Sequence, residues 1–352
     1  MPTHRFVLAN EQQDVVGQLS VTKARKEDTL SDIARRFNVG YEELVRANPK
    51  VDPWLPGDGR DIVVPTRFIL PNAPREGIVI NVAAMRMFYF PKRKATEPQV
   101  VYTHPIGIGK VGWSTPEGTT KVVRKKKDPV WIPGPGVRAE HKENGEILPK
   151  IVGPGPDNPL GNRAMYLGWS QYLIHGTNKP YGVGLRSSHG CIRLYPEDVE
   201  PIFEKVQIGD KVTVVNQPFV FGMDNGELFL QPYDVLEDDA RDFKKKQRAL
   251  IDRTLPKKVL AQLKAKNLAI DYALIASHAH DPSGVPISVS RADTSLDALI
   301  ASAPRVRNAV PKGATWDGVS NNQVDEASFN TMMSEAKDDP ATVPAAPAKS
   351  GN

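Results

Sequence analysis

Glycine and proline interrupt the apolar runs between residues 77 and 217 at short intervals, and this spacing limits what that part of the chain can form. The runs Ile78–Ala83, Met85–Phe90 and Val100–Ile106 are each as long as one strand, and Lys211–Val215 is another. Short apolar runs separated by turn residues are typical of β-structure. We expect a mainly β domain here, with one helix over Pro196–Val206, where apolar residues recur at helical spacing.

Residues 21–66 show a different pattern. Leu30, Ile33, Ala34 and Phe37 follow the spacing of an amphipathic helix, and Thr29 with Asp32 fits a capping box at its start. A second short helix is expected from Tyr41 to just before Pro49. The runs Val21–Lys23 and Asp61–Val64 are expected to be strands on either side. The sequence therefore predicts a small β-α-α-β module.

The remaining segments are assigned by composition. Residues 1–20 form an N-terminal segment, 67–76 a proline-rich linker, 218–337 a mixed C-terminal extension and 338–352 a disordered tail. Within the β domain, residues 124–162 are rich in proline and glycine, and we expect a long surface loop. Long loops in compact domains often form lids or binding loops.

The candidate catalytic residues lie in the stretch Ile174–Leu194. It contains the single cysteine of the chain, Cys191, with His189 close by and His175 upstream. A thiolate is the reactive form of cysteine, and a neighbouring imidazole can take its proton. Gly190 leaves backbone N–H groups open beside the sulfur, as an oxyanion hole requires. The carbonyl of Gly176 could accept a proton from one ring nitrogen of His175 and fix its tautomer.

A buried structural cysteine and a zinc site are the two alternatives to a nucleophile. Free cysteine is often a core residue, but the two histidines and the glycines around Cys191 argue against a plain core. One cysteine and two histidines could supply three zinc ligands, yet the spacing of common zinc sites is absent.

The net charge of +5, from 46 basic and 41 acidic residues, does not demand a nucleic-acid partner. No apolar run is long enough to cross a membrane.

The string SSHGCIRL, with HGT upstream, resembles the catalytic signature of the L,D-transpeptidases, which are YkuD-type cell-wall enzymes. The resemblance implies a β-sandwich-like catalytic domain over residues 77–217 that acts on peptidoglycan without cofactor or metal. It implies that His175 deprotonates Cys191, that the thiolate attacks a tetrapeptide stem, and that D-alanine leaves a thioester behind. An amine then takes the acyl group, either diaminopimelate of a second stem or a lysine of an outer-membrane lipoprotein.

The same resemblance assigns further residues of the site. Supporting or oxyanion roles fall to Ser188, His189, Gly190 and Gly176, and contacts with the substrate fall to Arg193, Tyr166 and Trp131. For Tyr166 and Trp131, an ordinary surface or packing role is the alternative. His189 lies two positions before Cys191, so it competes with His175 for the role of general base.

Residues 21–66 resemble LysM, a glycan-binding module, through the strings EDTLSDIARRF, ANP and LPGDGRDIVVP. The resemblance implies a sugar-binding groove that includes Asp28, Thr29 and Trp54. Packing of Trp54 onto the small core is the alternative to stacking on a sugar.

The resemblance also implies a periplasmic location, with no signal peptide in this chain. Two other functions stay open at this point. The same thioester attacked by water would make the protein a carboxypeptidase or amidase, and a non-catalytic wall-binding protein would depend on the LysM-like module alone.

Overall fold

The computed structural model describes residues 4–290 and 295–310, which we call the described residues. They divide into two compact units. The first comprises the described residues up to Pro105 together with those from Thr213 onward, and the second comprises Ile106–Val212. Strand β15 (Lys211–Val215) runs through the second of these boundaries.

The first unit contains an antiparallel sheet in the order β1-β8-β7-β6. Every residue of β6 and β7 is buried, since apolar side chains cover both faces. Phe88 and Phe90 of β7 pack with Phe68 and Val101 in one core. The strands are β1 (His4–Val7), β6 (Gly77–Asn81), β7 (Arg86–Phe90) and β8 (Val100–Pro105).

The β-α-α-β module also lies in the first unit. Thr29 caps the first helix, and its side chain and that of Asp32 complete the capping box. Leu30, Ile33 and Ala34 are fully buried, as expected for the apolar face of this helix. The elements are β3 (Ser20–Lys23), α1 (Leu30–Phe37), α2 (Tyr41–Ala47) and β4 (Asp61–Val64), with β3 and β4 antiparallel.

A buried ion pair joins this module to the sheet. The guanidinium of Arg86 on β7 donates two hydrogen bonds of 2.6 Å to Glu43 on α2, and it lies 4.1 Å from the ring centre of Phe68. Breaking a buried pair by removing one partner costs about 3–5 kcal/mol. The module is therefore attached to the β1-β8-β7-β6 sheet and does not form a separate domain.

The C-terminal extension folds around the hairpin of β16 and β17. Its helices pack on this hairpin through one apolar core that includes Phe221, Leu230, Ile251 and Ile275. The prediction of a mixed extension is confirmed. The elements of the extension are β16 (Phe219–Asp224), β17 (Glu227–Pro232), α5 (Phe243–Thr254), α6 (Lys257–Ala265), α7 (Tyr272–His280), β18 (Ile287–Ser288) and α8 (Leu296–Ser302). Two strands from earlier in the chain, β2 (Val15–Gly17) and β5 (Arg67–Ile69), pair with each other and contact β16.

Residues 304–306 of this extension contact the β-α-α-β module. The Val21 N–H donates to the Pro304 carbonyl at 3.0 Å, and the Val306 N–H donates to the Val21 carbonyl at 2.9 Å. Arg305 forms an ion pair with Asp61 at 2.7 Å. Residues 304–306 thus lie along β3 as an added strand segment, which the sequence patterns did not indicate.

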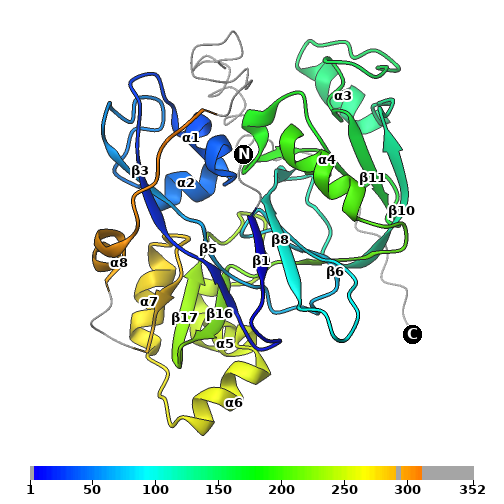
Figure 1. Ribbon diagram of the computed structural model, residues 1–352. Coiled ribbons are helices and arrows are strands. Elements are labelled where there is room, and N and C mark those ends of the chain that lie inside the picture. The colour runs from blue at the N-terminus through cyan, green and yellow to red at the C-terminus, as the bar shows by residue number, and fades with distance from the viewer. Residues whose placement is uncertain (1–3, 291–294, 311–352) are drawn as a thin grey trace. The chain divides into compact units, whose positions relative to one another are not determined.

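The second unit is built from short strands in the order β10-β11-β12-β14, with β9 and β13 paired separately. Helix α4 packs on β11 (Figure 1). The elements are β9 (Ile108–Gly109), β10 (Gly118–Lys127), α3 (Pro135–Glu143), β11 (Arg163–Leu167), β12 (Leu173–His175), the 3-10 turn Pro180–Gly182, β13 (Arg186–Ser188), β14 (Ile192–Arg193) and α4 (Pro196–Lys205).

The long segment 124–162 is not only loop. β10 continues to Lys127, and α3 occupies the middle of the segment. Pro135 at the first turn suits a helix start because its ring fixes φ and its missing N–H is not needed there. The sequence does not indicate this helix because its side chains form no apolar stripe, and none of them is buried.

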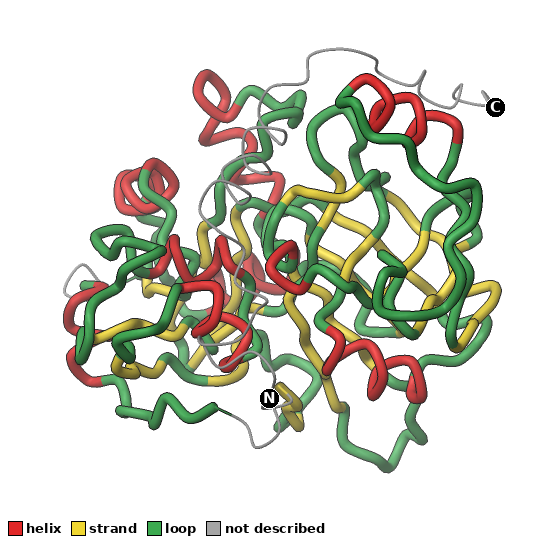
Figure 2. Tube along the Cα trace, turned by 90° about the horizontal axis from the view of Figure 1, so that it is seen from above, coloured by secondary structure: helices red, strands yellow, loops and turns green. Residues whose placement is uncertain are grey.

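Figure 2 shows that strands and loops make up most of the chain and that the helices are short. The prediction of a mainly β catalytic domain with a β-α-α-β module is confirmed. Within the described residues, no helix combines the length and apolarity needed to cross a bilayer. The predicted disordered tail 338–352 lies outside the described residues.

Candidate active site

Two neighbouring strands bring Cys191 and His175 into one region of the second unit. Strands β12 and β14 are parallel, with Ile174 opposite Ile192 and His175 opposite Arg193. His189, Gly190 and Cys191 form the connection between β13 and β14. His175 at the end of β12 and Cys191 just before β14 therefore lie on neighbouring strands, two positions apart in the register of the pair.

Gly190 has a backbone conformation that only glycine adopts easily. Its φ is +95°, and an added Cβ would lie 2.8 Å from Cε1 of Tyr172. Glycine is accordingly required for the turn itself and for the space beside the sulfur.

Two hydroxyl groups hold the carbonyls of this turn. Ser188 Oγ donates to the Cys191 carbonyl at 2.5 Å, and Thr115 Oγ1 donates to the Gly190 carbonyl at 3.0 Å. Because both carbonyls are engaged, the orientation of the adjoining peptide groups is fixed. Ser188 therefore supports the turn in this structure.

The segment carrying Thr115 approaches the turn closely. A Cβ added to Gly109 would lie 2.9 Å from the Cα of Gly190 and 1.9 Å from the Trp113 carbonyl oxygen. No larger residue fits between these two backbone segments.

His175 is buried and held in one orientation. Its Nδ1 lies 2.5 Å from the carbonyl oxygen of Gly176. A carbonyl oxygen can only accept, so Nδ1 carries the proton and Nε2 keeps its lone pair. Burial, helped by the positive charge of Arg193, lowers the pKa of His175 to about 3 despite the hydrogen bond to Gly176. The ring is thus a neutral base at physiological pH.

The thiol of Cys191 is also neutral in this state. Burial raises its pKa to about 11, although a backbone contact at Leu173 and the charge of Arg193 act in the opposite direction. Its sulfur lies 3.4 Å from the carbonyl oxygen of Gln171. The resting site therefore holds a neutral thiol and a neutral imidazole, and proton transfer between them must accompany the attack on a substrate.

Arg193 contributes a buried positive charge. Its Nη1 donates to Ser187 Oγ at 3.1 Å, and its backbone is bonded to Gly107 in both directions at 2.8 and 2.9 Å. Its Nε is buried without a hydrogen-bond partner.

His189 is engaged on another side. Its Nε2 lies 3.1 Å from Oε2 of Glu140 on α3, and its ring packs edge-on against Trp113 at 4.9 Å between centres. Glu140 is also paired with Lys110. Burial lowers the pKa of His189 to about 4, with Glu140 acting in the opposite direction.

Tyr166 and Trp131 have partners other than the residues of the cysteine turn. The guanidinium of Arg124 lies over the ring of Tyr166 on β11, with 3.6 Å between its Cζ and the ring centre. Trp131 pairs through its backbone with Val152, at 2.9 Å in both directions. Their roles as substrate contacts stay predictions.

The three candidate sugar contacts differ in exposure. Asp28 needs a correction, since its side chain is 0% exposed and paired with Arg36 Nη1 at 2.5 Å. Asn308 donates a further bond of 2.6 Å to the same carboxylate. A carboxylate buried in this way is a structural group, which a sugar hydroxyl does not reach. Thr29 is occupied as the helix cap, whereas Trp54 is partly exposed beside Leu55, which is 76% exposed.

Four residues near the cysteine turn were not found from the sequence, namely Lys110, Trp113, Thr115 and Glu140. They come from segments 51 to 81 positions before Cys191, and no local pattern marks them. The closest signal was the glycine-rich string GIGK, which ends at Lys110 and does not match a phosphate loop.

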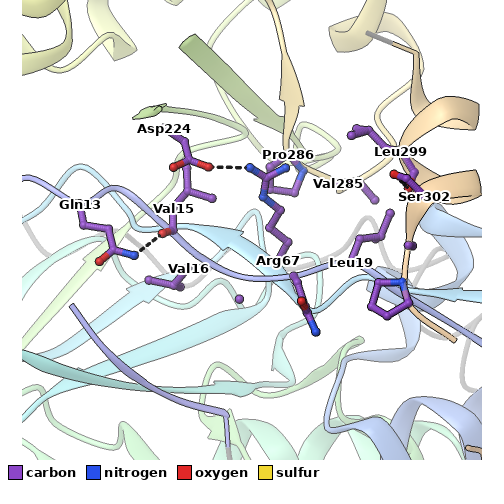
Figure 3. Close-up of a pocket in the computed structure, with 14 residues that line it drawn as sticks. Gln13, Val15, Val16, Leu19, Arg67, Asp224, Val285, Pro286, Leu299 and Ser302 are labelled. Atoms are coloured by element: carbon purple, nitrogen blue, oxygen red, sulfur yellow. Dashed lines mark hydrogen bonds and ion pairs between the residues drawn. The ribbon is translucent and has the colours of Figure 1, made fainter. Parts of the chain in front are cut away.

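A separate pocket of about 440 Å³ lies in the first unit (Figure 3). Its lining includes Gln13, Leu19, Arg67 and Asp224, and none of the residues of the cysteine turn. The guanidinium of Arg67 is already paired with Asp224 at 2.8 Å. Among the described residues, no three or more His, Cys, Asp or Glu side chains are grouped so that they could hold a metal ion.

The buried His175 and the partly buried His189 predict a loss of stability in mild acid. Both folded-state pKa values lie below the usual 6.5 of histidine, so below pH 6.5 the unfolded chain takes up protons that the folded chain does not. This stability is fully present above pH 6.5 and is lost as the pH falls toward 4. We expect each histidine to cost about 1 kcal/mol between pH 6.5 and 5.5.

Urea unfolding at both pH values measures this effect. His175→Gln should remove its share of the pH dependence, whereas the same change at His280, which is exposed, should leave it intact. An unchanged pH dependence in His175→Gln would contradict the burial of a neutral ring.

The sequence of this chain is similar to two known domain families and to several known proteins. A sequence model of the L,D-transpeptidase catalytic domain matches residues 75–214, and a LysM model matches residues 23–53. The probable L,D-transpeptidase ErfK/SrfK of Salmonella typhimurium is 36% identical over 291 residues, covering 81% of this chain and 91% of that protein. Two such proteins of Escherichia coli K12 are similar, YbiS at 37% over 289 residues and YcfS at 38% over 277 residues. These cover 81% and 77% of this chain and 92% and 83% of those proteins.

Proposed function

The chain belongs to the L,D-transpeptidase family, and from this we propose how its own residues carry out peptidoglycan L,D-transpeptidation. The observation that carries the proposal is the pairing of β12 with β14, which brings a buried, neutral His175 to the strand beside Cys191. The unprotonated Nε2 of His175 is the base, and Cys191 Sγ is the nucleophile.

In the first half-reaction, the thiol proton moves to His175 as Sγ attacks the carbonyl between the third and fourth residues of a tetrapeptide stem. The C–N bond breaks, the imidazolium returns the proton to the leaving amine, and D-alanine departs. A thioester with Cys191 remains. Starting from neutral partners avoids a charge pair inside a buried site, where ions are costly to hold.

Backbone N–H groups at Gly190 and Cys191 are the proposed oxyanion donors. Thr115 holds the Gly190 carbonyl, which shares a peptide group with the Cys191 N–H, so this N–H stays in place while charge develops. Ser188 holds the next carbonyl of the same turn, that of Cys191. Preorganised donors of this kind cost no reorganisation in the transition state.

In the second half-reaction, an amine attacks the thioester and gives its proton to His175, the C–S bond breaks, and the thiolate is reprotonated. We propose that the acceptor is diaminopimelate of a second stem or a lysine of a lipoprotein. Arg193 is the proposed partner of a substrate carboxylate because its positive charge acts on both Cys191 and His175. Tyr166 and Trp131 are weaker candidates for lining the peptide groove.

A transfer assay tests the proposal against hydrolysis. With a tetrapeptide stem and an added amine acceptor, we expect release of D-alanine in step with formation of a new amide, measured by mass analysis of the products. If the tripeptide acid is the dominant product at saturating acceptor, the protein is a hydrolase of the same bond.

We also propose a periplasmic location and a division into the module 21–66, the linker 67–76 and the catalytic domain 77–217. The module is proposed to retain the enzyme on glycan chains, with Trp54 stacking on a sugar face. Deleting the module would remove the partner of Arg86 and leave a buried charge unpaired, so point variants of the full chain are the better test.

We expect Trp54→Ala to weaken retention on purified peptidoglycan about threefold to tenfold, since aromatic packing contributes about 0.5–1.5 kcal/mol beyond area burial. A pull-down against peptidoglycan measures it. Ile208→Ala removes an apolar side chain that is 62% exposed in the second unit, and it should retain wild-type binding. Equal retention by Trp54→Ala would remove this residue from the glycan site.

A further inference from the structure

Glu140 connects helix α3 to the segment that carries the nucleophile. One of its carboxylate oxygens is paired with the ammonium group of Lys110, and the other lies 3.1 Å from Nε2 of His189. The side chains of Lys110, Glu140 and His189 are 11%, 17% and 26% exposed. Three partly buried polar groups from three segments thus form one network, two residues away from Cys191.

The chemistry of this network fixes a proton. An ionised carboxylate only accepts hydrogen bonds, so Nε2 of His189 must carry a hydrogen toward Glu140. Burial opposes ionisation of Glu140, but the hydrogen bond from Lys110 and the interaction with His189 outweigh it and hold the pKa of Glu140 below its usual value. Lys110 and His141, whose ring centre lies 6.0 Å from that of His189, are the other charged or titratable groups facing this histidine.

A second contact joins α3 to the same place. A Cβ added to Gly136 of α3 would lie 2.7 Å from the indole of Trp113, so helix and indole are in close contact. The same indole packs against His189, and the Trp113 carbonyl borders Gly190. The helix therefore docks on the cysteine turn through an apolar contact at its start and a charged one near its end.

We propose that Glu140 is a positioning residue of this active site, which latches helix α3 onto the nucleophile segment and holds His189 in its Nε2-protonated form. The proposal rests on the proposed function, because it makes α3 one wall of the groove that receives the donor stem. Glu140 does not touch the reacting atoms and acts through His189 and Lys110.

The isosteric change Glu140→Gln is the informative variant. Its amide oxygen can still accept from Lys110, but its NH₂ group then faces Nε2 of His189, and two donors cannot bond to each other. The proton of His189 must move to Nδ1, or the contact must open. Hydrogen bonds to charged groups are strong enough that we expect the KM for the donor stem to rise at least about tenfold, with kcat changed less than about threefold.

Three measurements on the full chain test the latch, with Glu143→Gln as the control because Glu143 is an exposed glutamate on the same helix. Two-bond ¹H–¹⁵N spectra of labelled histidine rings should show His189 protonated at Nε2 in the wild type and in Glu143→Gln, and altered in Glu140→Gln. Donor kinetics should show the split between KM and kcat. Thermal melting reports whether the fold is intact.

Wild-type donor kinetics and an unaltered His189 signal in Glu140→Gln would overturn the proposal. A lowered melting temperature with KM unchanged would reduce Glu140 to a structural residue and would also overturn it. If the wild-type protein releases no D-alanine, the proposed function fails, whereas the ring spectra still decide whether Glu140 sets the tautomer of His189.

Discussion

Cys191→Ala is expected to abolish acylation, with a loss of at least about 10⁴-fold in D-alanine release, because alanine has no atom that can form the thioester. The fold should survive the change. The cysteine is only half-buried, and the contact of its sulfur with the Gln171 carbonyl is long, at 3.4 Å. We expect a change in unfolding free energy of no more than about 1 kcal/mol.

Intact-mass spectrometry with a carbapenem measures this result directly. The β-lactam carbonyl can acylate the same thiolate, so the wild-type protein should gain one adduct and the alanine variant none. Thermal melting of both proteins controls for folding. Wild-type turnover in a well-folded Cys191→Ala variant would contradict the mechanism.

His175→Gln is expected to lower the acylation rate by about 10² to 10⁴, the usual contribution of a general base. Without the base, the thiol must ionise unaided, and its pKa of about 11 places that ionisation far above neutral pH. The rate of the variant should therefore keep rising as the pH is raised toward 11, and the deficit relative to wild type should shrink.

His189→Gln is the matched comparison for this prediction. In the structure Nε2 of His189 is directed to Glu140, so His189→Gln should retain the base and lack the rescue at high pH. Carbapenem acylation rates of both variants across pH give the answer. If His189→Gln shows the loss and rescue while His175→Gln acylates at the wild-type rate, the two histidines exchange roles.

Local sequence patterns predicted the elements that depend on neighbouring residues. The helix α1 begins where Thr29 and Asp32 form a capping box, and α4 begins at Pro196, as expected from the spacing of its apolar residues. The cysteine motif was found in the same way because its histidines and glycines lie within 17 positions of one another.

Contacts between distant segments could not be predicted in this way. His189 contacts Glu140, which lies on a helix with no apolar stripe, and Glu140 in turn is paired with Lys110. Asp28 was expected in a sugar-binding groove, but Asn308, 280 positions away, helps to bury it. Neither pairing leaves a periodic or compositional signal, since each is a tertiary contact between segments that are far apart in the sequence.

The central claim is that Cys191 holds the stem acyl group and passes it to an amine. Intact-mass analysis of the protein with a tetrapeptide stem tests this most directly, first alone and then after addition of an acceptor amine. We predict a mass gain of one tripeptide acyl group located at Cys191, release of one D-alanine, and loss of the adduct in step with a new amide when the amine is added. Release of D-alanine from a Cys191→Ala variant, or turnover with no adduct at Cys191 under single-turnover conditions, would contradict the claim.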